Sequence, residues 1–285
     1  MTILFRHLKK LKWKFHLLKD FWGTKIWTKT TETVTPLGFK LTSGFHPAYR
    51  LMRIGKFEIE ETAIISKLLA QVDLFVDIGA NLGYYTCLAL QNGKPVVAFE
   101  PQQQNLECLF KNLMANGWQD NAEVFPLALG EKPELLTLYG ASGPSASLVK
   151  NWAGYSSHFK KVVPVSTLDN ILAGRFLGQR LFIKMDVEGA EYQVLKGGGG
   201  ILALSPKPIW LLEVCLQEFH PEGKNPDFLK TFQLFWENGY QAWTATENPK
   251  LVTSNDVYNW VKWNHSDSGT FNYVFAETAD IFREQ

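Results

Sequence analysis

The sequence lacks the long apolar runs that would carry a chain across a lipid bilayer. No stretch approaches the roughly 18 consecutive apolar residues that read as a membrane-spanning helix. The amino terminus is basic, and its Lys and Arg residues interrupt it too often to leave the continuous apolar core of a secretory signal. We therefore expect a cytoplasmic protein.

Cysteine is also scarce. The three cysteines, Cys87, Cys108 and Cys215, are widely separated, and the sequence holds no CxxC pair and no Cys/His cluster. A disulfide framework and a structural zinc site are therefore both disfavoured. We expect free thiols in a reducing compartment.

An excess of charge of either sign is missing too. Lys and Arg number 29 against 28 Asp and Glu, for a formal net charge of +1. The basic residues gather in residues 1–22, where they outnumber acids six to one, and the remainder is slightly acidic. A chain whose remaining residues form no basic stripe is not expected to bind nucleic acid.

Residues 1–22 place apolar side chains at alternating steps of four and three, which predicts a basic amphipathic helix. The stripe consists of Leu4, Leu8, Leu11, Phe15, Leu18 and Trp22. Such a helix can lie on an anionic inner-membrane surface as a peripheral contact. The alternative is a helix that docks on its own domain or on a second subunit of a homodimer. The sequence leaves both readings open.

Beyond this helix the pattern is that of a doubly wound α/β protein. Residues 31–43 read as a hairpin and residues 58–69 as a helix. The buried strands are LFVDIG, PVVAFEP, LFIKMDV and PIWLLEVC, with further strands at AEVFPLALG, ELLTLYG, YQAWTAT and NYVFAE. The helices are YYTCLALQNG, NLECLFKNLMANG, EYQVLKGG and DFLKTFQLFWENG, each ending near glycine. Alternation of this kind predicts a mostly parallel sheet with helices on both faces. We divide the chain into an extension, residues 1–44, and a domain, residues 45–285.

The stretch VDIGANLGYYT carries two glycines, Gly79 and Gly83, directly after a predicted strand. A dinucleotide fingerprint GxGxxG would need a third glycine where Asn81 stands, and no GxxxxGK[ST] motif occurs. Glu100 ends the next strand, 21 residues after Gly79, where an acid can accept hydrogen bonds from ribose hydroxyls. These features favour an adenosine cofactor without phosphates, S-adenosyl-L-methionine, over NAD(P). An NAD(P)-dependent oxidoreductase remains the alternative.

Three motifs together resemble the FkbM family of S-adenosylmethionine-dependent methyltransferases: VDIGANLGYYT, VVAFEPQQQN and FIKMDVEGAEYQVLKGG. The similarity runs from Phe45 to Glu277 and includes GKFEIEE, PLALG and PVSTLDNIL. It implies a Rossmann-like class I methyltransferase fold with a seven-stranded sheet, and O-methylation of a sugar, glycan or other small natural product. The cofactor-binding residues it implies are Glu58, Asp77, Gly79, Asn81, Gly83, Glu100, Pro101, Ala128 and Asp186.

Acidic residues follow the later strands and are the candidates for the chemistry. Asp186 ends FIKMD, two residues after Lys184 on the same strand face, and Glu188 follows it. The catalytic candidates are Asp186, Glu188, Glu213 and His220. Asp186 could instead be only an N-cap, and Glu191 is better explained by packing or a salt bridge. The three acids Asp186, Glu188 and Glu213 could also ligate a divalent ion, although we expect no metal.

The segment Tyr139–Phe159 is long and rich in Gly, Ser and aromatic residues, as lids and acceptor-binding loops often are. Trp152 and Tyr155 could stack on a sugar ring or cover the core. Two further functions compete with the methylation of a small molecule. A nucleic-acid methyltransferase is disfavoured because MDVE stands where an NPPY-type tetrapeptide is expected. The second competing function is that of a non-catalytic, membrane-attached module that only binds the cofactor.

Overall fold

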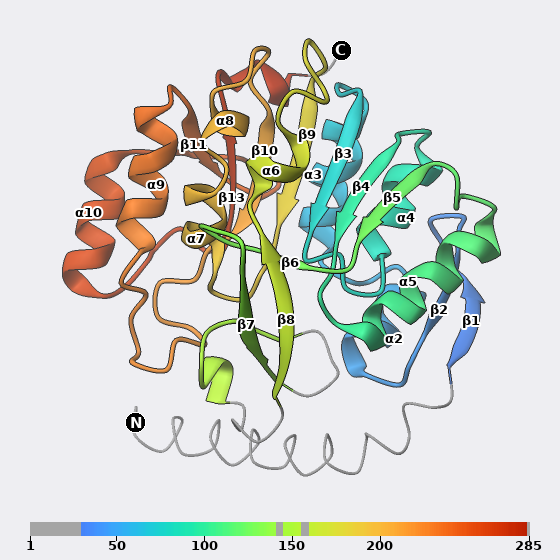
Figure 1. The fold of residues 1–285 in the computed structure, drawn as a ribbon. Coiled ribbons are helices and arrows are strands. Elements are labelled where there is room, and N and C mark those ends of the chain that lie inside the picture. The colour runs from blue at the N-terminus through green and yellow to red at the C-terminus, as the bar shows by residue number, and fades with distance from the viewer. Residues whose placement is uncertain (1–29, 141–144, 155–159, 284–285) are drawn as a thin grey trace.

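The structure is a computed structural model that describes residues 30–140, 145–154 and 160–283 (Figure 1). The predicted amphipathic helix of residues 1–22 and the aromatic Tyr155 lie outside the described residues. The two readings of that helix, a membrane contact or a docked stripe, therefore stay predictions. Within the described ranges, no helix is both long enough and apolar enough to cross a membrane.

A parallel sheet of five strands forms the centre of the molecule. Its strands are β3 (Leu74–Ile78), β4 (Val96–Phe99), β5 (Ala122–Phe125), β9 (Leu181–Met185) and β10 (Ile209–Glu213). They lie in the order β10-β9-β3-β4-β5. Every residue of β3, β4 and β9 is buried. Strands covered on both faces read as continuous apolar runs, which is why the sequence predicted them.

Antiparallel strands complete one edge of this sheet. They are β13 (Asn272–Ala276), which pairs with β10, then β11 (Gln241–Thr244) and β12 (Leu251–Val252). The described sheet thus has eight strands, one more than the seven expected, and the addition is the two-residue β12. The predicted mostly parallel α/β sheet is confirmed.

Helices cover both faces of the sheet (Figure 1). One layer holds α3 (Ile59–Leu69), α4 (Tyr84–Gln91) and α5 (Gln103–Asn116). The other holds α6 (Leu168–Leu172), α7 (Glu191–Lys196), α8 (Gly199–Leu202), α9 (Phe228–Glu237) and α10 (Ser254–Trp263). Successive strand residues point to opposite layers, so Phe75 joins the first apolar cluster and Val76 the second.

The predicted hairpin forms and packs on the first helical layer. Strands β1 (Thr31–Val34) and β2 (Lys40–Ser43) pair antiparallel. The Asn112 side chain of α5 accepts from the backbone N–H of Thr42 at 2.5 Å and donates to its carbonyl at 3.2 Å. A short helix that the sequence did not predict, α2 (Pro47–Arg53), follows. His46 caps it, accepting at Nδ1 from the backbone N–H of Ala48.

A separate three-stranded sheet covers part of the cavity described below. It consists of β6 (Ala128–Leu129), β8 (Lys160–Ser166) and β7 (Glu134–Tyr139), in that order. Its inner face packs Ala128, Leu138, Val163 and Val165 together. Two short 3-10 helices, η1 (Trp152–Gly154) and η2 (Ala279–Phe282), complete the described elements.

Candidate active site

Four acidic side chains lie at the carboxyl ends of neighbouring strands. Asp77 lies on β3, Glu100 follows β4, Asp186 follows β9, and Glu213 ends β10. The chain runs from β3 outward to β4 and β5 and then returns to form β9 on the other side of β3. Ligands bind in the crevice at such a reversal of strand order. A cavity of about 530 Å³ opens there, and all four acids line it.

The glycine turn after β3 lets two strand ends approach each other. Gly79 has φ +84°, and a Cβ on it would lie 2.0 Å from the carbonyl oxygen of Asp186. Only glycine permits this contact between the turn and the end of β9. Gly83 has a different task, because a Cβ there would lie 2.2 Å from Leu109 Cδ1 on α5. Gly79 lines the cavity, whereas Gly83 packs two helices together and is not among the lining residues.

Glu100 is buried and engaged by the backbone on both carboxylate oxygens. The backbone N–H of Asn81 donates to Oε2 at 2.8 Å, and that of Gln102 donates to Oε1 at 2.7 Å. Burial raises the pKa of Glu100 to about 7, and these hydrogen bonds oppose the rise. The side chain of Asn105 also hydrogen-bonds this carboxylate. A carboxylate has about four acceptor sites, so Glu100 can still accept from a ligand hydroxyl. The neighbouring Pro101 and Ala128 also line the cavity.

Asp77 is almost fully buried beneath the turn. The hydroxyl of Thr86 donates to its Oδ2 at 2.6 Å, while Oδ1 has no hydrogen-bond partner among the described residues. Burial raises the pKa of Asp77, and the charge of Lys184 opposes this. An unpartnered buried carboxylate oxygen beside a cavity indicates a place for a donor group of a ligand.

Lys184 is the cation at the centre of these acids. Its Nζ lies 3.3 Å from Oδ2 of Asp186 and 5.2 Å from the centre of the Tyr85 ring. Burial opposes its charged form, but the carboxylates of Asp186, Asp77, Glu58 and Glu213 raise its pKa overall. Lys184 therefore stays protonated and acts as a fixed positive charge rather than as a base.

Glu58 reaches the cavity from the residue before α3. Its backbone is left-handed, with φ +38°, and the hydroxyl of Tyr85 donates to Oε2 at 2.7 Å. Burial raises the pKa of Glu58 to about 7, with Lys184 opposing the rise. The cavity therefore brings Glu58 close to the Lys184 and Asp186 pair.

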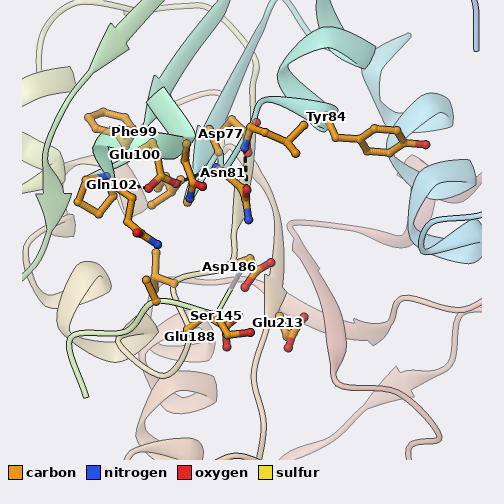
Figure 2. A pocket seen from close by; sticks show the side chains of 18 of the residues that line it. Asp77, Asn81, Tyr84, Phe99, Glu100, Gln102, Ser145, Asp186, Glu188 and Glu213 are labelled. Carbon is orange, nitrogen blue, oxygen red and sulfur yellow. Dashed lines mark hydrogen bonds between the residues drawn. The ribbon is translucent and has the colours of Figure 1, made fainter. Parts of the chain in front are cut away.

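Asp186, Glu188 and Glu213 gather on the side of the pocket opposite Glu100 and Asn81 (Figure 2). Burial raises the pKa of both Glu188 and Glu213 well above the usual carboxyl value, and the nearby charge of Asp186 adds to the rise in each. The indole Nε1 of Trp152 donates to Oε2 of Glu188 at 2.5 Å. Within the described residues, no group of three or more His, Cys, Asp or Glu side chains is arranged to hold a metal ion.

Glu191 does not line the cavity and instead stabilises the turn beside it. It begins α7, whose N-cap is Ala190, so Asp186 is not the N-cap that its position had allowed. The buried carboxylate of Glu191 accepts from the backbone N–H of Gly189 at 2.9 Å. Burial raises its pKa to about 7, although backbone hydrogen bonds oppose this. Glu191 closes the turn that presents Asp186 and Glu188.

Two aromatic candidates are placed away from the cavity surface. Trp152 is only 2% exposed, so it covers the core and cannot stack on a sugar ring. His220 is half-buried, packs edge-on against Trp152 at 4.7 Å between ring centres, and is not among the lining residues. Burial lowers the pKa of His220. Its role as a general base stays a prediction that this geometry does not support.

Several lining residues were not predicted. His46, Pro47 and Ala48 reach the cavity from α2, and Phe219 from the segment after β10. Tyr85 also lines it, and the aromatic pair that follows the glycine turn was the one available signal for this residue. The others depend on contacts between distant segments, which no local pattern encodes.

The sequence matches the family profile described as the methyltransferase FkbM domain over residues 77–242. Among solved structures, it is similar to a methyltransferase FkbM from Methylobacillus flagellatus, with 19% identity and a TM-score of 0.45. That match covers 72% of this chain but only 43% of the other, so the chain spans less than half of that protein's length. An O-methyltransferase from Bacillus cereus in complex with SAH matches with 13% identity, 76% and 80% coverage, and a TM-score of 0.42. No curated protein matches the sequence.

Proposed function

Because the chain belongs to the FkbM methyltransferase family, we propose that it transfers a methyl group from S-adenosylmethionine to a hydroxyl of a sugar, glycan or other small natural product. The observation that carries this proposal is the division of one cavity into two sides. The glycine turn and Glu100 line one side, and Asp186, Glu188 and Glu213 line the other.

The cofactor side fits S-adenosylmethionine. Glu100 can still accept a hydrogen bond from a ribose hydroxyl, and Gly79 leaves the turn without a Cβ. The unpartnered Oδ1 of Asp77 offers an acceptor for a donor group such as the methionine ammonium. This wall also includes Asn81, Pro101 and Ala128, and we expect Ala128 to lie near the adenine. When bound, S-adenosylmethionine supplies a methyl group activated by a sulfonium.

The acid side suits removal of a proton from the acceptor hydroxyl. A carboxylate with a raised pKa is a stronger base once it is ionised, and in that form Glu188 or Glu213 can take the proton of the acceptor hydroxyl. Lys184 holds Asp186 by an ion pair, so Asp186 can accept a hydrogen bond from the hydroxyl and orient it. His220 has no part in this assignment, because it does not line the cavity.

Calorimetry tests the cofactor first. We expect the full chain to bind S-adenosylhomocysteine and not NADH, because Asn81 occupies the place of the middle glycine of a dinucleotide turn. Glu100→Ala should abolish this binding, since it removes the acceptor for the ribose. Binding of NADH alone would support the oxidoreductase alternative and contradict the proposal.

Mass spectrometry with methyl-labelled S-adenosylmethionine and a panel of simple glycosides then tests the transfer. Asp186→Asn should keep S-adenosylhomocysteine affinity and lose about a hundredfold in turnover, because misplacing the reacting hydroxyl by even a small distance can cost that much. Asp120→Asn, at an exposed position, is the matched control and should change neither quantity. Cofactor binding without any labelled product across the panel would favour the non-catalytic module.

A further inference from the structure

Trp152 connects three segments that meet at the acid side of the cavity. Its Nε1 donates to Glu188, and its ring packs against Gly189, where a Cβ would lie 2.4 Å from ring atom Cζ3. The same ring meets His220 edge-on, with the ring centres 4.7 Å apart. The next residue, Ala153, donates its backbone N–H to the carbonyl of Phe219 at 2.7 Å. The segment 145–154 thus joins the turn after β9 to the segment after β10.

The backbone of Glu188 needs this support. Glu188 has φ +56°, a left-handed conformation that is unfavourable for a residue with a side chain. Its carbonyl accepts from the hydroxyl of Ser147 at 2.5 Å, while its side chain accepts from Trp152. Two residues of one segment therefore hold Glu188 by its main chain and by its carboxylate.

We propose that Trp152 is the positioning residue for Glu188. Its indole N–H fixes the direction of the carboxylate in the cavity and favours the ionised form that can accept a proton. The effect of Trp152 on turnover rests on the proposed function. The link between Trp152 and the charge of Glu188 does not, because it can be measured without a substrate.

The other charged groups around Glu188 define what the indole contributes. Asp186 and Glu191 lie on the same turn, Lys184 on β9, and Glu213 on β10 with Cys215 behind it. His220 packs edge-on against Trp152. Burial, Asp186 and Glu191 raise the pKa of Glu188, while Trp152 and Lys184 lower it. Loss of the indole N–H should therefore make the ionised carboxylate less stable.

Trp152→Phe tests this link, because it keeps a ring against Gly189 and removes the donor. Thermal unfolding of the full chain is followed from about pH 5 to about pH 9, a range that extends well above the usual carboxyl pKa. The unfolding midpoint of Trp152→Phe should fall further below that of the wild type as pH rises, because ionised Glu188 loses its donor. In a Glu188→Gln background, Trp152→Phe should lower the unfolding midpoint by the same amount at every pH. An equal, pH-independent loss in both backgrounds would overturn the proposal.

A direct comparison of the two variants covers the case in which Trp152→Phe is very unstable. Adding Glu188→Gln removes the carboxylate that has lost its donor, so at about pH 9, the highest pH of the series, the double variant should unfold at a higher temperature than Trp152→Phe. A double variant that is no more stable at this pH contradicts the role of Trp152.

Turnover of the labelled methyl group gives the functional arm. Trp152→Phe should lower kcat by about tenfold, less than removal of the acid itself, and leave the KM for S-adenosylmethionine unchanged. With Glu188→Gln already present, it should lower kcat no further. The same drop in both backgrounds would indicate a merely structural role. If no glycoside is methylated, the proposed function fails, whereas the thermal comparison still decides the role of Trp152.

Discussion

Glu100 is a buried carboxyl whose charge should control cofactor affinity. With its pKa raised to about 7, it is largely protonated at pH 6 and ionised at pH 8. Ribose hydroxyls donate to the ionised form, so binding should favour it. Only about a tenth of the molecules are ionised one unit below the pKa, so the Kd for S-adenosylhomocysteine should be about tenfold weaker near pH 6 than near pH 8. Calorimetry across this range measures it.

Two variants isolate the residue responsible. Glu100→Gln should bind weakly with no dependence on pH, because the amide does not titrate. Glu58→Gln removes the other cavity carboxyl with a pKa of about 7 and should keep the dependence. If the pH dependence disappears in Glu58→Gln and survives in Glu100→Gln, the assignment of the ribose to Glu100 is wrong.

The sequence predicts which single residues lie at the cavity when those residues stand at the end of a predicted strand. Asp77, Glu100, Asp186 and Glu213 all follow or end apolar runs, and in the structure all four line one cavity. The burial of Trp152 could not be predicted, because the space it fills exists only where Gly189 lies, 37 residues later in the chain. A side chain buried by a distant segment leaves no periodic signal nearby.

The turn between β3 and α4 should depend on Gly79 for folding itself. In Gly79→Ala the new Cβ would be on a left-handed backbone and would clash with the carbonyl of Asp186. That carbonyl is main chain, so it cannot move aside as a flexible side chain could. We expect a loss of about 4 kcal/mol or more in the free energy of unfolding, the range of severe backbone and packing defects. Urea denaturation measures it.

Gly117, at the end of α5, is the matched control for Gly79. Its backbone has φ +73°, but a Cβ on it meets nothing within 4 Å. Gly117→Ala should therefore cost only the backbone term, about 1–2 kcal/mol. Equal losses in the two variants would mean that the close approach of the strand ends adds nothing to the requirement for glycine at position 79.

Elements differ in how much of them the sequence reveals. The strands β3, β4, β9 and β10 appear as unbroken apolar runs because helices cover both their faces. By contrast β8 begins with three exposed residues and buries only Val163 and Val165, so the sequence shows no apolar run there. The helix α10 was missed although Thr253 and Asp256 form a capping box, a signal that is readable in the sequence.

The whole molecule concentrates buried acids around its cavity, and this should make its stability depend on pH. Burial raises the pKa of Glu58, Glu100 and Glu191 to about 7, above the value of 4.5 in an exposed chain. Between these values the folded protein holds more protons than the unfolded one. The stability that these groups contribute is therefore complete below pH 4.5 and is lost as pH rises through about 7.

We expect the thermal midpoint of the ligand-free chain to fall between about pH 5 and about pH 8, with each of the three carboxyls costing up to about 3 kcal/mol. Lys184 stays charged throughout this window. His220, whose pKa burial lowers, acts in the opposite direction but is one half-buried group against three. Glu191→Gln keeps an acceptor for Gly189 and cannot ionise, so its midpoint should fall less steeply. A wild-type midpoint that rises across this range would mean that the cavity acids are stabilised in their charged forms without a ligand.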